Sequence, residues 1–598
     1  MGIKQRLRLS TVGLRAKKGL GAHHVYKEKL SDFGECIAGY YQDGKLTSPE
    51  VADCCKAVVT SCAASQHAPA DAKVLGRHAV SCTKLRTYRG KTRLDTRNSC
   101  RDLQRAFRRY SKFKGVTPYK APVQMYDPVL ESNYVGKVSF LLIYELLEAL
   151  VPCGEEMEYC RFPEERHGFI LELESWARRA GVDVNIGAWA AIGLWGDDGE
   201  FRKRDALNLL SWHLLNTENR TKYWYCCLSK RQLCRCGCKG RCSFDTLFTV
   251  LAWDMEVLRR GVHPYDDHFG KPFLENSPRG RLAGRPLRVR GGLVAKQADW
   301  SWYKQVLGLV GWRGQGPDLK ICWECGGTKG EPCPAYDFSL RSLWRKTDRR
   351  VAVQCASFNS AFWTIPGVSS ETIRGDWMHI VCLGILPIMM GAVVFEIFTS
   401  LGGSLYASGR HEIMQQINSM CRCMAREHGD LPFVEIKLNM VRTSMAKHPC
   451  LKLKAAEARY FLPVLRKVLM NCVDISSPHA VLRFNCLNEL YLCYHELENW
   501  SDVHSMQRLS EHGRKHLQLF MELQHEAVRN GDEKLWHTVP KHHLFAHFLD
   551  GTWGTINPRL LWNYGFESEL GRCIKTARGC NPKYIQVKLI ERYILLLQ

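Results

Sequence analysis

Two histidines near the C-terminal end of the sequence have a spacing that suits metal binding. His543 and His547 are four residues apart, so both rings would lie on one face of a helix. A Cys-x-x-Cys pair, Cys322 and Cys325, occurs far earlier in the chain. Two thiolates and two imidazoles are a common ligand set for structural zinc, in which protein fills all four positions. The residues predict such a Zn2+ site; the alternative is a reduced Cys-x-x-Cys loop and ordinary helical histidines.

Three carboxylates stand where predicted elements end or begin. Asp198 ends a predicted strand over residues 186–195. Asp299 follows another over residues 287–295, and Glu567 opens a helix. Two aspartates on neighbouring strands and one acid on a packed helix can hold two divalent cations about 3.5–4 Å apart, as phosphodiester chemistry requires. Hard oxygen ligands favour Mg2+ or Mn2+. We therefore predict a catalytic site of these three acids with Mg2+ or Mn2+; the alternative is that each acid is solvated on the surface.

The elements that must position these residues form a strand region and a long helical block. Short connections between runs at residues 186–195, 206–215 and 223–228 predict an antiparallel meander, which a helix over 244–260 follows. From about residue 379 to 536, apolar residues recur at three- and four-residue spacing, which predicts helices almost throughout. Further predicted helices cover residues 135–150, 165–180, 412–428, 455–473, 478–500 and 505–530. The pattern predicts an α/β core whose strands and last helix are separated by an all-helical insertion.

The positive charge of the chain is concentrated at its N-terminal end. The net charge is +24, and residues 1–120 hold 25 Lys and Arg against 9 Asp and Glu, a net of +16. This asymmetry favours a polyanion partner, most simply nucleic acid, over the alternative of a solubilising arm. A predicted helix over residues 98–110 would carry arginines along one side. The predicted phosphate contacts are Arg105, Arg108, Arg109 and Lys112.

Two other stretches bear on metal binding and on membranes. Cys234, Cys236, Cys238 and Cys242 fall within nine residues and could hold a second zinc ion; a glycine-rich loop with free thiols is the alternative. The longest apolar run, residues 380–398, contains a proline and a glutamate, which favours a buried helix over a membrane span. We expect no membrane association.

The order of these motifs resembles that of one enzyme family. The chain carries in turn two aspartates, the Cys-x-x-Cys pair, Asp376-x-Met-His379, the helical block, Lys-x-His-x3-His and Phe-Glu. This order is similar to that of the DDE transposases of the CACTA (En/Spm) type. The Cys-x-x-Cys pair after the second aspartate and the paired histidines before the glutamate also resemble Transib transposases and the catalytic subunit of the V(D)J recombinase, where these residues bind zinc. The resemblance spans roughly residues 185–590.

The resemblance implies an RNase H-like core and cut-and-paste chemistry at transposon ends. A DNA phosphodiester would be hydrolysed, and the freed 3′-hydroxyl would attack target DNA. Asp198, Asp299 and Glu567 would be the catalytic acids; Asp197 could replace the first, and Asp376 is a reserve for the second. Cys322, Cys325, His543 and His547 would bind zinc, and His542 could replace His543.

The expected organisation has four parts. Residues 1–125 form a basic, mostly helical or irregular DNA-binding region, and residues 126–378 form the first part of the core, with cysteine-rich loops. Residues 379–536 are the insertion, and residues 537–598 complete the core. Implied partners are double-stranded DNA, as transposon ends and target, and further copies of the chain in a homo-oligomer; the implied location is nuclear. The competing hypothesis is a catalytically inactive, transposon-derived, zinc-stabilised DNA-binding protein.

Overall fold

The protein divides into two compact units, residues 1–115 with 594–598, and residues 116–593. The structure is a computed structural model. Apart from short stretches elsewhere, it describes residues 116–151, 167–183, 189–217, 221–311, 319–349, 360–427, 433–474, 476–501, 504–554 and 556–594. In the first unit, strands β1 (Leu85–Tyr88) and β2 (Lys91–Leu94) form an antiparallel hairpin. The predicted helix over residues 98–110 and the predicted contacts Arg105, Arg108, Arg109 and Lys112 lie outside the described residues.

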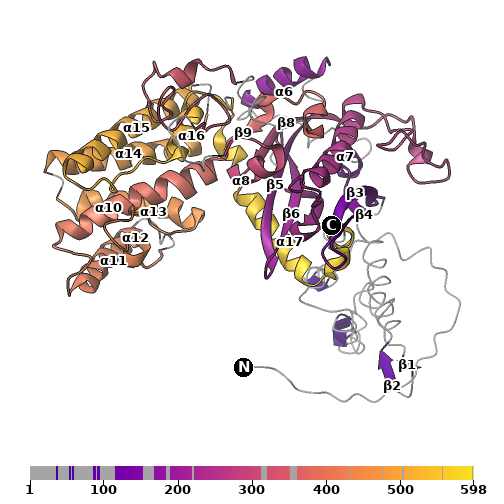
Figure 1. Ribbon diagram of the computed structural model, residues 1–598, viewed down its shortest axis with the longest axis horizontal. Helices are drawn as coiled ribbons and strands as arrows, with labels where there is room; N and C mark the ends of the chain where they lie inside the picture. Colours follow the sequence, from indigo (N-terminus) through magenta and orange to yellow (C-terminus); the bar gives the residue numbers. More distant parts are fainter. Residues whose placement is uncertain are drawn as a thin grey trace. The chain divides into compact units, whose positions relative to one another are not determined.

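The second unit is built around a five-stranded mixed sheet (Figure 1). β5 (Trp189–Arg202), β6 (Asp205–Leu214) and β7 (Tyr223–Ser229) form an antiparallel meander. β8 (Arg290–Ala298) and β9 (Ile373–Arg374) extend the sheet in parallel beside β5, giving the order β7-β6-β5-β8-β9. These strands are buried almost throughout, which is why they read as continuous apolar runs in the sequence. The predicted meander and the α/β class are confirmed.

Helices cover both faces of this sheet. A side chain at Gly291 of β8 would meet α7 (Arg241–Arg260), whereas one at the next residue, Gly292, would meet α6 (His167–Ala180). Because side chains alternate along a strand, α6 and α7 lie on opposite faces. The face of α6 also receives α17 (Tyr564–Arg578), which packs against β5, and α18 (Ile585–Tyr593), which packs against β7. A three-layer arrangement results, with the sheet in the middle.

The register of the parallel strands brings acidic residues to one edge of the sheet. β5 and β8 stay paired up to Gly196 and Ala298, so the next residues, Asp197 and Asp299, are level. β9 ends two residues before Asp376. Parallel strands lie about 4.8 Å apart, and the crevice at their carboxyl ends is where open α/β sheets usually bind ligands. The sheet therefore gathers three carboxylates at the place where a site is expected.

The segment before the main sheet differs from its prediction. Residues 135–150 were expected to form one helix. Instead, this range holds most of strand β4 (Ser132–Phe140) and then α5 (Ile143–Leu150). β4 pairs antiparallel along its whole length with β3 (Tyr119–Asp127), inside which the predicted boundary at residue 125 falls. The pairing of β4 with β3 outweighs the helical spacing of the apolar residues, because cross-strand contacts decide the conformation of such a segment.

The described residues between β9 and α17 form helices, turns and loops. They begin with a π-helical turn, η12 (Met378–Ile385), that runs into α10 (Leu386–Ser400). Figure 1 shows the following helices grouped together beyond β9. They are α11 (Arg410–Glu427), α12 (Leu438–Val441), α13 (Ala455–Asn471), α14 (Pro478–Glu498), α15 (Ser505–Arg529) and α16 (Pro540–Leu549). The short turn η13 (Pro558–Leu561) comes later in the chain, and its Leu561 belongs to the core cluster that contains Trp176 of α6 and Val294 of β8. The helices predicted over residues 412–428, 455–473, 478–500 and 505–530 are confirmed.

One apolar helical stretch in this group, Met378–Ser400, is long enough to cross a membrane. Its most apolar window is 94% buried inside the fold. Glu396 within it accepts hydrogen bonds from the indole of Trp536 at 2.6 Å and from Arg483 at 3.1 Å. A buried carboxylate with such partners is typical of a core helix packed against its neighbours, as the sequence predicts.

Replacing Phe566 by alanine should destabilise the second unit, because this ring fixes α17 on the sheet. Phe566 is fully buried and stacks on Trp195 of β5, with ring centroids 5.0 Å apart. Loss of a buried phenylalanine costs about 3–5 kcal/mol, so the thermal midpoint should fall by several degrees. Tyr584→Ala is the control; this side chain is 50% exposed, and its loss should cost less than about 0.5 kcal/mol. Equal midpoints for the two variants would contradict the packing described.

Candidate metal centres

Three potential metal ligands meet just beyond the point where β5 stops pairing with β8. A carboxylate oxygen of Asp197, a ring nitrogen of His379 and a carboxylate oxygen of Glu567 all lie within 4.8 Å of one another. β5 carries Asp197, η12 carries His379, and the first turn of α17 carries Glu567. The fold thus joins residues from three elements far apart in the sequence.

The two adjacent aspartates of β5 point in opposite directions, because side chains alternate along a strand. Asp197 faces Glu567, whereas Asp198 forms an ion pair with Lys230 at 2.7 Å. The predicted first carboxylate, Asp198, therefore does not join the other acids, and its predicted substitute, Asp197, does. Both lie inside β5, which continues to Arg202 instead of ending at Asp198 as expected. The choice between them therefore depends on which face of the strand each side chain occupies.

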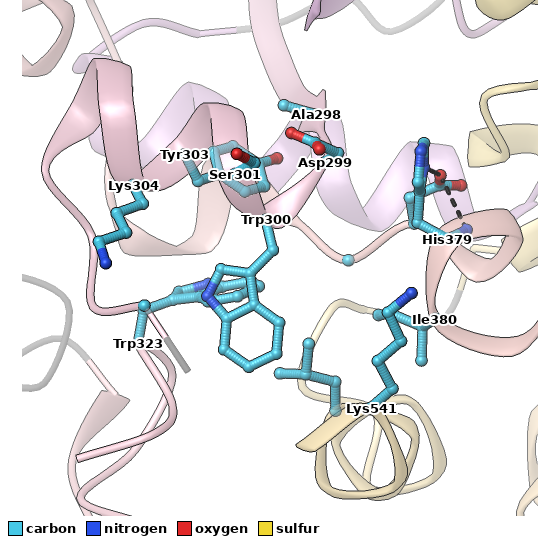
Figure 2. Close-up of a pocket in the computed structure, with 14 residues that line it drawn as sticks. Ala298, Asp299, Trp300, Ser301, Tyr303, Lys304, Trp323, His379, Ile380 and Lys541 are labelled. Atoms are coloured by element: carbon cyan, nitrogen blue, oxygen red, sulfur yellow. Dashed lines mark hydrogen bonds and ion pairs between the residues drawn. The ribbon is translucent and has the colours of Figure 1, made fainter. Parts of the chain in front are cut away.

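Asp299 lies beside this group, at the end of β8. It lines a cavity of about 430 Å³ (Figure 2). Its lining also includes Asp376, His379, Lys304 and Lys541. One oxygen of Asp299 accepts the backbone N–H of Trp302 at 2.6 Å and so caps the short helix α8 (Trp300–Trp302). The cap holds this carboxylate at the rim of the cavity.

The acids affect one another's protonation in the way expected of a cation site. Burial and the charges of Asp299 and Glu567 raise the pKa of Asp197 to about 8. Burial also raises the pKa of Glu567, although the charge of His379 opposes the shift. One oxygen of Glu567 is buried and has no hydrogen-bond donor among the described residues. A divalent cation between Asp197 and Glu567 would relieve the repulsion and supply the missing partner, so these residues fit one.

Asp376 holds the group together rather than facing it. Its side chain is 1% exposed and accepts the backbone N–H groups of Met378 and His379 and that of Asn563, which precedes α17. It also binds the His379 ring at 2.5 Å. Burial lowers the pKa of His379, but the bond and charge of Asp376, together with Asp299 and Glu567, outweigh burial and raise it to about 9. In the sequence, His379 appeared only as part of the Asp376-x-Met-His379 motif, without a site role of its own, and that spacing was the signal that could have identified it.

A second group consists of Cys322, Cys325, His543 and His547, as predicted. All four are buried, and their ligand atoms lie within 4.8 Å of one another. The Cys322 Sγ to His547 Nε2 distance is 3.4 Å, and the Cys325 Sγ to His543 Nε2 distance is 3.3 Å. Zinc bonds of about 2.0–2.3 Å in a tetrahedron place neighbouring ligand atoms about 3.3–3.8 Å apart. The group therefore has the dimensions of a zinc site.

The hydrogen bonds of His543 and His547 also support metal binding by this group. His543 Nδ1 lies 2.7 Å from the carbonyl oxygen of Ala335, which can only accept, so Nδ1 carries the proton and Nε2 exposes a lone pair. His547 Nδ1 contacts the Thr552 hydroxyl at 3.1 Å. The two Nε2 atoms face each other at 3.2 Å beside two sulfurs. Such outer contacts orient histidine ligands, and a cation removes the repulsion among the inner atoms. The alternative ligand His542 lies elsewhere, with its ring against Phe520.

A buried ion pair supports this site, and no sequence motif indicated it. Glu324, between the two cysteines, is 1% exposed and pairs with Arg349. Arg349 also donates to the carbonyl oxygens of Thr552 and of Ile373 in β9, both at 2.9 Å. The indole of Trp553 donates to Glu324 at 2.8 Å. These contacts join the Cys-x-x-Cys loop to the edge strand of the sheet and to the segment that leads into α17.

A third group comprises Cys234, Cys236, Cys238 and Cys242, on the turn between β7 and α7. The four sulfurs lie within 4.8 Å of one another. The described residues therefore contain two groups that could hold a zinc ion, one with four sulfurs and one with two sulfurs and two nitrogens.

Comparison with known proteins suggests no function for this chain. No known protein family and no curated protein matches this chain. A proposal for its function therefore rests on the three clusters and on the order of the strands.

Removing a ligand of the Cys2His2 group should release its metal and destabilise the second unit. We expect Cys325→Ser to bind one zinc ion fewer per chain than the wild type and to melt several degrees lower, because a structural metal contributes directly to folding. Cys333→Ser is the matched control, since this cysteine lies in the same loop outside the group. Metal analysis and thermal scans measure both effects. Equal zinc content in the two variants would show that the group does not bind zinc.

Proposed function

We propose that this protein is a transposase-like enzyme that cleaves DNA phosphodiesters with divalent cations and joins the freed 3′ end to target DNA. Its core would be RNase H-like, interrupted by the helices between β9 and α17. A three-strand antiparallel meander continued by two parallel strands supports this core. Asp197 lies on the first strand in chain order, Asp299 follows the fourth, and Glu567 lies on the helix that follows the insertion.

The observation that carries the proposal is the meeting of Asp197 and Glu567, which are 370 residues apart in the chain. A carboxylate pair with a third acid, Asp299, at its side is an oxygen-rich ligand set suited to Mg2+ or Mn2+. When bound, two such ions activate a water or 3′-hydroxyl and stabilise the leaving oxygen. The set differs from the zinc groups, which are rich in sulfur.

The other residues of the cavity would bind and orient the DNA backbone. Lys304 and Lys541 line it and would offset phosphate charge. Trp300, also on the wall, offers an aromatic surface to a sugar or base. His379 carries a positive charge at neutral pH and, held by Asp376, can donate to a phosphate oxygen through the nitrogen that now faces Glu567. These residues position the scissile group against the acids.

Binding to duplex DNA would rest on the basic N-terminal region, with Arg105, Arg108, Arg109 and Lys112 as contacts. Because each neutralised phosphate releases counterions, affinity should fall steeply with salt. Strand transfer joins two ends, so we propose a homo-oligomer as the active form and the nucleus as its location.

A DNA-nicking assay distinguishes the role of Asp197 from that of Asp198. With supercoiled plasmid and Mn2+ or Mg2+, Asp197→Ala and Glu567→Ala should each lower the nicking rate roughly 10³-fold, because loss of a metal ligand removes several kcal/mol of transition-state stabilisation. Asp198→Asn is the matched control, since asparagine keeps a hydrogen bond to Lys230, and it should retain most activity. Equal rates for all variants and the wild type would instead favour a DNA-binding protein without catalysis.

A second test concerns the orienting residue. Asp376→Asn should reduce nicking about 10–100-fold and raise the Mn2+ concentration needed for half-maximal rate, because outer partners of ligands have effects of this size. Asp474→Asn, at an exposed turn, is the control. An unchanged metal requirement in Asp376→Asn would show that Asp376 does not organise the acids.

A further inference from the structure

The group of four cysteines stands apart from the acids and has no part in the chemistry proposed above. Cys234 and its neighbours follow the end of β7, and Cys242 lies in the first turn of α7. The Sγ atoms of Cys236 and Cys242 are 3.6 Å apart. Four sulfurs around a tetrahedral zinc ion lie about 3.8 Å apart. The sulfurs thus need only small movements to enclose one ion.

The backbone of this turn is shaped to bring the sulfurs together. Gly237, Lys239 and Gly240 have φ angles of +92°, +56° and +87°. Glycine adopts such angles freely, but Lys239 does so at a cost, and backbone strain of this kind persists where other interactions impose it. The chain therefore winds tightly through Cys236 and Cys238, and this brings their sulfurs within 4.8 Å of those of Cys234 and Cys242. A loop with free thiols would not require this winding.

The same turn is strongly basic. Residues 230–242 contain five basic side chains and no acid. They are Lys230, Arg231, Arg235, Lys239 and Arg241, of which the last four are exposed. A metal that closes a short loop would hold these cations in a fixed array, whereas a flexible loop would let them spread apart.

The turn is also fixed to the rest of the unit at two places. Lys230 pairs with Asp198, the neighbour of Asp197 on β5. Arg235 packs over the ring of Tyr126 in β3, and its backbone N–H donates to the Asn133 side chain of β4 at 2.8 Å. The basic turn is thus tied to the strand that carries the first acid of the proposed active site.

We propose that Cys234, Cys236, Cys238 and Cys242 bind a second structural zinc ion, and that the loop they close binds the phosphates of nucleic acid through its exposed cations. The zinc site stands on the sulfur geometry alone. Its use for nucleic acid rests on the DNA binding proposed above. The pair Lys230 and Asp198 explains why two aspartates follow one another on β5: one faces the acids, and the other holds the basic loop.

Zinc content tests the site. The full-length wild type should contain two zinc ions per chain, and Cys236→Ser/Cys238→Ser should contain one, with the Cys2His2 ion retained. The matched control is Cys423→Ser/Cys472→Ser, which removes two exposed cysteines outside both groups and should keep two ions. In the native wild type, a chelator should speed alkylation of Cys236. This measurement does not depend on whether a variant folds. One zinc ion in the wild type, or a Cys236–Cys242 disulfide in the intact mass, would overturn the site.

Salt-dependent binding to a duplex tests the use of the loop. If Arg231 and Lys239 each contact a phosphate, Arg231→Gln/Lys239→Gln should make the slope of log affinity against log salt shallower by roughly two. Arg422→Gln/Arg426→Gln, an equal charge change on α11, should leave the slope unchanged. Equal slopes for both variants would refute phosphate contact by the loop. Because the metal and binding measurements need no catalysis, a failure of the nuclease proposal would be seen separately, as absent nicking.

Discussion

The Cys2His2 group is the contact on which the rest of the second unit depends. Its cysteines come from the loop after β8, and its histidines come from α16, at the end of the helical insertion. More than two hundred residues separate the two pairs, and closing so long a loop costs chain entropy. A metal ion held by this group, beside the buried pair of Glu324 and Arg349, would offset that cost at one point. The chain leaving α16 is then delivered to the edge of the sheet, where α17 begins.

From this point, α17 is aligned by contacts to neighbouring strands. Phe566 stacks on Trp195, and Asp376 accepts the backbone N–H of Asn563 at 3.2 Å. Glu567 is the residue after Phe566, and Asp197 lies two residues after Trp195, on the same face of β5. The stacking of Phe566 on Trp195 therefore helps to set the distance between the two carboxylates. Burial is the main cause of the raised pKa values of Asp197 and Glu567, and the charges of neighbouring acids add to it. The scaffold holds them together in spite of the repulsion between these charges.

Much of this arrangement could be read from the sequence. Continuous apolar runs marked the meander, three- and four-residue spacing marked the insertion helices, and ligand types with their spacing marked Cys322, Cys325, His543 and His547. What failed depended on tertiary contacts. The phase of β5 decides between Asp197 and Asp198, and pairing with β3 turns residues 132–140 into a strand. Glu324 and Arg349 carry no motif, because a buried ion pair is defined by partners distant in the chain.

The most direct test of the central claim is a crystal structure of the full chain soaked with Mn2+, with anomalous data at the manganese and zinc edges. The account expects zinc within bonding distance of Cys322, Cys325, His543 and His547. It also expects manganese bound by both Asp197 and Glu567, with Asp198 turned toward Lys230. Manganese bound elsewhere, or a Glu567 carboxylate too far from Asp197 to share an ion, would contradict it.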